Sequence, residues 1–316
     1  MQVTVAICTY QRADALRAAM ESLAQCDPPG EPWQLLIVDN ADEPAVRELV
    51  ESFKNRLPVT YVAESKTGVS HARNRALAEC TTPVVVFADD DVTFDHAWLR
   101  RMADAIAQHD ECDFWGGRVK PVWLTDQPAW FAPDRCPMLL DMIVHYDGGD
   151  EPRAWDRQTL KPFFCANLAM RVDAAQAVGG FDTGAGHFGQ RRGAGEDGFM
   201  VDALVSRGGR GWYVGDAVVH HPVPPERVTR RFARRFAWRQ GWVSAETHRR
   251  LEGGDAQRLP RWWYRVAIEQ GCRSFGRWIA GLLRFDSAAA FAGEFGMRYN
   301  LSRFWHALRR REQCPE

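Results

Sequence analysis

Short apolar runs alternate with longer amphipathic stretches over the first 110 residues of the chain. The short runs are continuous in Val, Ile, Leu and Phe, which is typical of strands buried on both faces. The longer stretches repeat apolar side chains every three or four positions, as a helix with one buried face does. The pattern predicts strands over 3–9, 35–38, 59–62 and 84–87 and helices over 13–25, 45–54, 70–79 and 97–108. This alternation indicates an α/β fold with a mainly parallel sheet covered by helices on both faces.

The periodic pattern weakens after residue 118 and changes in character near residue 225. Residues 121–160 are rich in Pro, Trp and Asp without a sustained period, which predicts long loops. Beyond residue 225 the chain is rich in Arg, and apolar spacing predicts helices over 227–251 and 261–283. We therefore expect one α/β domain over 1–225 and a helical C-terminal region over 226–316.

Charge is distributed unevenly between these two regions. Residues 226–316 contain 19 Arg and no Lys against nine acidic residues, although the whole chain has a net charge of -1. Such a split favours contact with phosphates, an anionic membrane surface or an acidic partner. A solvated helical surface packed on an acidic body, or a contact between two subunits, explains it equally well. No nucleic-acid-reading motif accompanies the arginines, so we expect no nucleic acid partner.

The chain shows neither an N-terminal signal-peptide core nor a run of about 18 apolar residues, so a membrane span is not predicted. Its eight cysteines include no Cys-x-x-Cys pair. In such a chain they are expected to be reduced, mostly buried thiols. The predicted location is cytoplasmic, or peripheral on the inner face of a membrane.

Three consecutive carboxylates, Asp89-Asp90-Asp91, follow the fourth predicted strand directly. They repel one another unless a hard cation such as Mg²⁺ or Mn²⁺ offsets their charge. In an extended segment Asp89 and Asp91 point the same way and Asp90 the other, so the first and third can share a ligand. An acidic loop or a helix cap is the alternative.

Three further groups carry candidate chemistry. Glu196-Asp197 precedes an apolar helical run and is either a helix cap or a general base. His220-His221 follows a predicted strand over 212–219 and is either a metal-ligand candidate or structural. Arg73 opens a predicted helix, where it either binds phosphate or is simply solvated.

Taken together and in order, six short motifs resemble those of the family 2 glycosyltransferases, which have the GT-A fold. The resemblance covers about residues 1–225. The motifs are Thr9-Tyr10-Gln11-Arg12, Val38-Asp39-Asn40, Ala72-Arg73-Asn74, Asp89-Asp90-Asp91, Gly180-Phe181-Asp182 and Gly195-Glu196-Asp197. In the first motif Gln11 departs from the asparagine that is common in the family.

The resemblance assigns most of these residues to a nucleotide-sugar donor. Thr9 and Asp39 would hold the nucleotide base, and Arg73 would lie in the donor pocket near the nucleotide. Tyr10 and Arg12 belong to the same donor site by their place in the first motif.

The acidic run divides between the ribose and a metal ion in this family. Asp89 would meet the ribose, Asp91 would coordinate Mn²⁺ or Mg²⁺ in the manner of a DXD motif, and Asp90 completes the donor site. One of His220 and His221 would meet the metal or the diphosphate.

Asp197 resembles the catalytic base of inverting members, with Glu196 beside it. The implied activity is metal-dependent transfer from a nucleotide-diphosphate sugar, preferably a UDP-sugar, to an acceptor hydroxyl in glycan or glycoconjugate biosynthesis. The acceptor would be a glycan, a lipid-linked molecule or a small molecule. The rival functions are a nucleotidyltransferase, which would need a glycine-rich loop after the first strand, and a non-catalytic sugar- or membrane-binding module.

Overall fold

The structure is a computed structural model that describes residues 2–185, 195–251 and 259–308. The chain forms two compact units. The first comprises residues 1–122, 144–190 and 196–222, and the second comprises residues 123–143, 191–195 and 223–316. The break near residue 222 lies close to the sequence-based division at 225, but residues 123–143 belong to the second unit.

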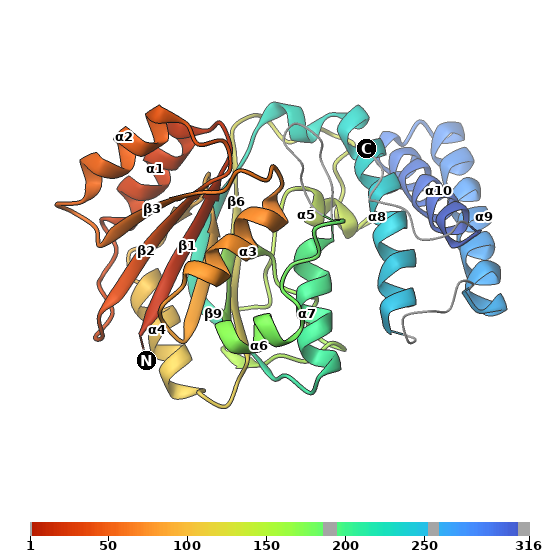
Figure 1. Cartoon of the computed structure of the whole chain (residues 1–316). Helices are drawn as coiled ribbons and strands as arrows, with labels where there is room; N and C mark the ends of the chain where they lie inside the picture. The colour runs from red at the N-terminus through yellow and green to blue at the C-terminus, as the bar shows by residue number, and fades with distance from the viewer. Residues whose placement is uncertain (1, 186–194, 252–258, 309–316) are drawn as a thin grey trace. The chain divides into compact units, whose positions relative to one another are not determined.

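The first unit is built on a mixed sheet with strand order β3-β2-β1-β4-β8-β6-β9-β5, and β7 pairs with β9 (Figure 1). The strands are β1 Val3–Thr9, β2 Trp33–Asp39, β3 Val59–Ala63, β4 Val84–Asp89, β5 Thr93–Phe94, β6 Phe114–Trp123, β7 Arg153–Ala154, β8 Leu168–Arg171 and β9 Gly211–Val223. The predicted α/β class is confirmed, but the sheet is mixed rather than mainly parallel as the sequence predicted. Parallel pairing joins β3, β2, β1 and β4, whereas β8 is antiparallel to both β4 and β6, and β5 and β7 are antiparallel to β9.

Helices cover both faces of this sheet because the chain reverses its direction of travel across it. The helices of this unit are α1 Ala13–Leu23, α2 Pro44–Phe53, α3 Val69–Glu79, α4 Trp98–Gln108, α6 Val172–Ala177 and α7 Glu196–Ser206, with a 3₁₀ turn η1 Cys165–Asn167. The steps β1 to β2 and β2 to β3 run one way, and β3 to β4 runs back. Right-handed crossovers then place α1 and α2 on one face and α3 on the other. Accordingly α1 contacts α2, and α3 contacts α6.

The reversal creates a switch point between the neighbouring strands β1 and β4, whose connections leave in opposite directions. Ligands of open α/β sheets bind outside the carboxyl ends of the strands at such a point. Thr9 ends β1 and Asp89 ends β4. The apolar residues Val84 to Ala88 that precede Asp89 are at most 4% exposed, which fixes β4 rigidly below this edge.

The second unit is helical. Its elements are α5 Met138–Met142, η2 Pro225–Val228, α8 Arg230–Leu251, α9 Arg261–Leu283 and α10 Ser287–Leu308. Helix α9 has the predicted bounds, but α8 begins at Arg230 rather than 227 because the short 3₁₀ turn η2 precedes it. The sequence pattern did not predict α10, which packs against both α8 and α9. The region 121–160 is likewise not all loop, since it contains the end of β6, α5 and β7.

No helix within the described ranges is long and apolar enough to cross a membrane. The described cysteines are all free, as predicted. Their burial is more varied than expected: Cys112, Cys136 and Cys165 are buried, Cys8, Cys26 and Cys80 are partly buried, and Cys272 is exposed. Cys314 lies outside the described residues.

Candidate functional site

Asp89 ends β4, Asp90 and Asp91 lie in the turn that follows, and the three side chains point in alternate directions. Asp90 turns inward and is 4% exposed. It accepts a hydrogen bond of 2.7 Å from the Thr9 hydroxyl and one of 2.6 Å from the Arg12 guanidinium. Burial raises the pKa of Asp90 to about 7, although Arg12 and the Thr9 hydrogen bond oppose the shift. Asp90 therefore ties the end of β4 to the loop after β1.

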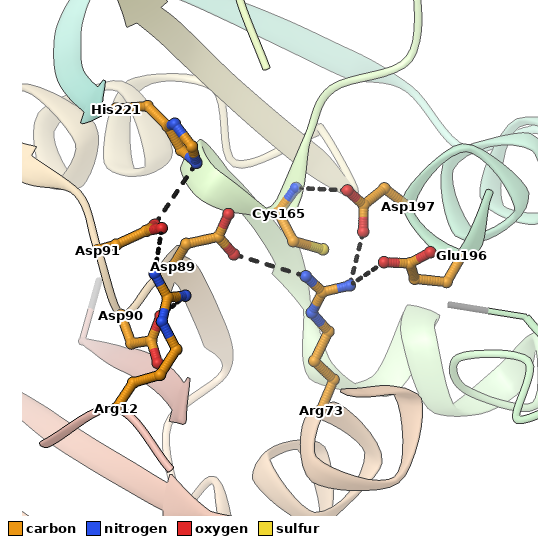
Figure 2. Close-up of polar contacts among 9 residues, drawn as sticks. All are labelled: Arg12, Arg73, Asp89, Asp90, Asp91, Cys165, Glu196, Asp197 and His221. Atoms are coloured by element: carbon orange, nitrogen blue, oxygen red, sulfur yellow. Dashed lines mark hydrogen bonds and ion pairs between the residues drawn. The ribbon is translucent and has the colours of Figure 1, made fainter. Parts of the chain in front are cut away.

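Asp89 and Asp91 point to the other side, where His221 joins them (Figure 2). One ligand atom from each of the three residues lies within 4.8 Å of the others. His221 comes from β9 and is 1% exposed. Arg12 also donates to Asp91 at 2.6 Å, so its guanidinium links Asp90 to Asp91.

The two histidines have different positions because both lie inside a strand. The prediction that they follow the strand is wrong, since β9 continues to Val223. Neighbouring strand residues face opposite sides, so only one of the pair can turn toward the carboxylates. His221 Nε2 lies 3.5 Å from Asp91 Oδ1, whereas His220 Nε2 hydrogen-bonds with Asp95 at 2.6 Å. The structure thus brings His221 to the acidic cluster and places His220 outside it.

Arg73 connects the acidic cluster to the Glu196-Asp197 pair. It lies on α3, and its side chain is 7% exposed. Its guanidinium donates to Asp197 at 2.6 Å and to Glu196 at 3.1 Å, and it lies 3.6 Å from Asp89 (Figure 2). The carboxylates of Asp89 on β4 and of Glu196 and Asp197 on α7 therefore share the buried Arg73 guanidinium as their partner.

Asp197 stands at the first turn of α7, where the sequence placed it. Its Oδ1 accepts from Arg73, and its Oδ2 accepts from the backbone N–H of Cys165 at 3.1 Å. Burial raises the pKa of Asp197, while Arg73 opposes that shift. A carboxylate with a raised pKa and a fixed orientation is suited to accept a proton.

Cys165 was not singled out from the sequence. It opens the 3₁₀ turn before β8, and its backbone holds the second oxygen of Asp197. A lone cysteine in an irregular segment carries no sequence signal for this contact with Asp197, which the backbone and the side chain of Cys165 both make.

Two of the sequence motifs are joined directly by Asn74, which the sequence analysis also left without a role. Its side chain accepts from the Phe181 N–H at 2.7 Å and donates to the Phe181 carbonyl at 2.8 Å. Gly180 precedes this contact with φ +75°, and a Cβ there would meet Asn74 Oδ1 at 2.5 Å. The two neighbouring residues thus have separate roles in the site. Arg73 contacts the carboxylates, and Asn74 hydrogen-bonds with the turn at residues 180–182.

The remaining donor-site candidates lie at the adjacent ends of β1 and β2, where Thr9 is paired with Asp39. Asp39 is 0% exposed and accepts from the N–H groups of Ala41 and Glu43. Its carboxylate also accepts from the Tyr61 hydroxyl at 3.1 Å. In the structure Asp39 therefore fixes the loop after β2.

The first loop holds its middle residue in an unusual backbone conformation. Tyr10 is partly buried, and Gln11 adopts φ 54°, in the left-handed region. Asparagine tolerates this conformation better than most residues. An asparagine here would thus be the less strained choice, and Gln11 retains the turn at some conformational cost.

The cluster of Asp89, Asp91 and His221 offers ligand atoms that fit a divalent cation. A cation about 2.1 Å from each ligand needs ligand atoms no more than about 4.2 Å apart, so small side-chain rotations suffice. Carboxylate oxygens suit Mg²⁺ and Mn²⁺, and one imidazole is compatible with Mn²⁺. The site can thus hold a divalent cation beside Asp89 and Asp91 and also offer a proton acceptor at Asp197.

Solved structures of glycosyltransferases resemble the whole chain. S. aureus TarS in complex with UDP superposes with a TM-score of 0.52 at 17% identity, covering 96% of this chain and 90% of that one. The mannosyltransferase PcManGT from Pyrobaculum calidifontis, in complex with GDP-Man and Mn²⁺, gives a TM-score of 0.55 at 17% identity, covering 94% and 86%. At these identities the likeness shows the fold, which is that of the GT-A glycosyltransferases.

The family follows from the sequence itself. The model of Glycosyl transferase family 2 matches residues 4–177, and the chain belongs to this family of glycosyltransferases. It is 28% identical over 295 residues to the succinoglycan biosynthesis protein ExoM of Rhizobium meliloti, covering 92% of this chain and 87% of that protein. It is 27% identical over 196 residues to the glucosyl-dolichyl phosphate glucuronosyltransferase of Haloferax volcanii, covering 60% and 59%.

Proposed function

We propose that the chain is an inverting, metal-dependent glycosyltransferase that moves a sugar from a nucleoside-diphosphate sugar to an acceptor hydroxyl. The observation that carries this proposal is the joint placement of Asp89, Asp91 and His221 beside Arg73, which in turn holds Asp197. One side of Arg73 is suited to a diphosphate with its cation, and the other is suited to proton transfer. The same arrangement leaves no need for a glycine-rich phosphate loop.

In the proposed mechanism Asp197 accepts the proton of the acceptor hydroxyl as its O–H bond breaks. The acceptor oxygen forms a bond to the anomeric carbon, the bond from that carbon to the diphosphate breaks, and the electron pair leaves with the diphosphate. Attack from the face opposite the leaving group inverts the anomeric centre. Glu196 beside Asp197 and the shared Arg73 fix the orientation of the base.

The donor is held by residues around the switch point. Asp91 and His221 would hold Mn²⁺ or Mg²⁺, which would supply positive charge beside the leaving diphosphate. Asp89 faces the ribose, Thr9 and Asp39 the base, and Tyr10, Arg12 and Asp90 complete this side. We favour a UDP-sugar as donor.

Related proteins support a nucleotide-sugar donor, but they do not point to one class of acceptor. Structures of TarS contain UDP or UDP-GlcNAc, and that of PcManGT contains GDP-Man with Mn²⁺. ExoM is named for succinoglycan biosynthesis, and the Haloferax relative is named a glucosyl-dolichyl phosphate glucuronosyltransferase. We propose a glycan, a lipid-linked molecule or a small molecule as acceptor, within glycan or glycoconjugate biosynthesis.

We further propose that residues 1–225 carry the transferase chemistry, whereas residues 226–316 serve acceptor, membrane-surface or subunit contacts in the cytoplasm. The uneven distribution of arginines supports this division.

A thermal-shift screen of UDP-, GDP- and dTDP-sugars with and without Mn²⁺ tests donor and metal together. We expect a UDP-sugar to raise the melting temperature only when Mn²⁺ is present, and UDP release to follow in the absence of acceptor. A nucleotidyltransferase would instead respond to a nucleoside triphosphate and a sugar phosphate. A binding module would be stabilised without releasing UDP.

The adjacent histidines provide a matched pair of variants. His221→Ala should raise the Mn²⁺ concentration needed for donor binding by about tenfold or more, because it removes one ligand of the cluster. His220→Ala removes the same side chain one position away and should leave the Mn²⁺ requirement unchanged. An equal effect of both substitutions would show that the cluster is not the metal site.

A further inference from the structure

Asn167 is a fully buried amide that ends the 3₁₀ turn η1. Its backbone N–H closes the turn by donating to the Phe164 carbonyl at 2.9 Å. The residue is 0% exposed. Because burial of an amide costs free energy unless its polar atoms are hydrogen-bonded, the partners of this side chain show what it holds together.

The side-chain amide of Asn167 has partners on three different elements. Its Nδ2 donates to the Arg118 carbonyl of β6 and to the Ala217 carbonyl of β9, both at 2.9 Å. Its Oδ1 accepts from the indole N–H of Trp98 on α4, also at 2.9 Å. These partners fix the orientation of the amide, because carbonyls only accept and an indole N–H only donates. A single side chain thus ties η1 to two strands and one helix.

The chain leaves room for this amide at Gly117 of β6. A Cβ at that position would lie 2.3 Å from Asn167 Nδ2 and 2.3 Å from the Ala217 carbonyl oxygen. Glycine within a strand often marks the close approach of another segment, and here that segment is η1. The glycine and the amide therefore belong to one arrangement.

The turn that Asn167 locks also makes the contact with Asp197. Cys165, two residues earlier in the turn, donates its backbone N–H to Asp197 Oδ2 at 3.1 Å (Figure 2). The Cys165 thiol hydrogen-bonds with the same carboxylate. Since Asp197 lies on α7, both bonds depend on where η1 is held. A shift of the turn would therefore change the surroundings of Asp197 without any change on α7.

The groups that face Asp197 have opposing effects on its pKa. Burial raises this pKa and Arg73 on α3 lowers it, while Glu196 raises it and both hydrogen bonds from Cys165 lower it. Asp89 at the end of β4 is a further negative group nearby. Loss of the Cys165 bonds would leave the raising effects less opposed, so the pKa of Asp197 would rise.

The metal-ligand candidates are held mainly by other contacts. Asp89 ends β4, which is paired with β1 along its whole length. His221 lies on β9 directly after the residues that pair with β5. A change at Asn167 should therefore act mainly on the side of the site that contains Asp197.

We propose that Asn167 is a positioning residue that sets the place of the Asp197 carboxylate by locking η1 against β6, β9 and α4. It acts through the Cys165 contacts and takes no part in proton transfer itself. The inference rests on the proposed function in treating Asp197 as the catalytic base.

The test measures the pKa of Asp197 directly, by carbon-13 NMR of the full chain labelled at its aspartate carboxyl carbons. Asp197→Asn identifies the resonance. In Asn167→Ala the pKa of Asp197 should lie about half a unit or more above that of the wild type. The acid limb of the kcat/KM pH profile should move the same way, and turnover should fall by about tenfold or more. The increase in melting temperature caused by UDP with Mn²⁺ should stay that of the wild type.

Trp98→Phe is a second variant, and it also serves if Asn167→Ala fails to fold. It keeps an aromatic ring and removes only the N–H that Asn167 Oδ1 accepts. Because both donated bonds of the amide remain, the pKa shift of Asp197 should have the same direction and a smaller size.

Thr82→Val is the matched control. It removes buried hydrogen bonds, including the one to Thr4, at the opposite end of β4 from the site. It should lower the free energy of unfolding but leave the pKa of Asp197 unchanged.

An equal pKa of Asp197 in the wild type, Asn167→Ala and Trp98→Phe would overturn the proposal. So would a shift of the same size in Thr82→Val, since general loss of stability would then explain it. If the wild type released no UDP while the pKa still rose in Asn167→Ala, the positioning role would hold and the proposed function alone would fail.

Discussion

At the residue scale, the site depends on one arginine that contacts several carboxylates. Arg73 is the shared partner of Asp89, Glu196 and Asp197, so three negative groups are held by one buried guanidinium. Burial alone raises the pKa of Asp89 and of Asp197, and the Arg73 guanidinium opposes this. The acid–base properties of the candidate base thus depend on a residue from another helix.

Asp197→Asn removes the proposed proton acceptor while keeping the shape of the side chain. Turnover should fall by about 10² to 10⁴, the usual contribution of general-base catalysis. The melting-temperature increase caused by a UDP-sugar with Mn²⁺ should remain. Asp104→Asn, at an exposed position on α4, serves as the control and should leave both quantities unchanged. Near wild-type turnover of Asp197→Asn would show that another group takes the proton.

Arg73→Gln should shift the acid limb of the kcat/KM pH profile to higher pH. Asp197 must be deprotonated to act as a base, and burial raises its pKa above the usual value of about 3.9. The wild-type limb should therefore lie above that value. Removal of the opposing cation raises the pKa further, so a larger fraction of Asp197 is protonated at any given pH.

Arg73→Lys is the matched control, because it keeps the positive charge but loses the forked hydrogen bonds. Its acid limb should lie between those of the wild type and Arg73→Gln. A purely structural role for Arg73 predicts slower turnover in both variants with no movement of the limb.

At the element scale, the strands that lead into the site were readable from sequence and the later elements were not. The apolar runs of β1, β2 and β4 are readable because these strands are covered on both faces, whereas the edge strand β3 is only partly buried. Helix α10 was not predicted because its alanines, glycines and aromatic residues do not form a single apolar stripe along one face. The strand end before His220 was misplaced, since β9 continues through Pro222 to Val223, and proline is tolerated where a strand donates no ladder hydrogen bond.

The candidate site was predictable as a set of residues but not as a set of contacts. Asp90 does face away from Asp89 and Asp91, but strand alternation is not the reason, because only Asp89 lies in β4 and the other two lie in the turn after it. The choice of His221 over His220 needed the register of β9 with β5. Asn74 contacts Phe181 and Cys165 contacts Asp197, and each contact joins segments that are far apart in the sequence. No periodic pattern of residues predicts such contacts.

Gly180 offers a test of the turn that joins two motifs. Gly180→Ala forces a Cβ to within 2.5 Å of Asn74 Oδ1 at φ +75°, so it should destabilise the chain by about 1–3 kcal/mol. Gly198→Ala is the opposite case, because a Cβ there meets nothing within 4 Å inside α7. It should stabilise by about 0.5–1 kcal/mol. Urea unfolding of both variants measures the change in the free energy of unfolding. Equal changes in the two variants would contradict the requirement for glycine at position 180.

At the scale of the whole molecule, the ligand cluster and the helical packing belong to different compact units. Asp89, Asp91 and His221 lie in the first unit, and the contact between α9 and α10 lies in the second. Gly293 is central to that contact, since a Cβ there would lie 2.3 Å from the backbone nitrogen of Trp278. Defects in this packing should leave the ligand site intact.

Gly293→Ala should therefore lower the free energy of unfolding by about 1–3 kcal/mol through overpacking. A ligand that binds only the folded state adds about 2.7 kcal/mol at a hundred times its Kd, whatever the starting stability. The stabilisation by UDP with Mn²⁺ should thus be the same in Gly293→Ala and in the wild type. Gly276→Ala, where a Cβ meets nothing within 4 Å, is the control and should not destabilise. A reduced ligand stabilisation in Gly293→Ala alone would show that the helical packing takes part in donor binding.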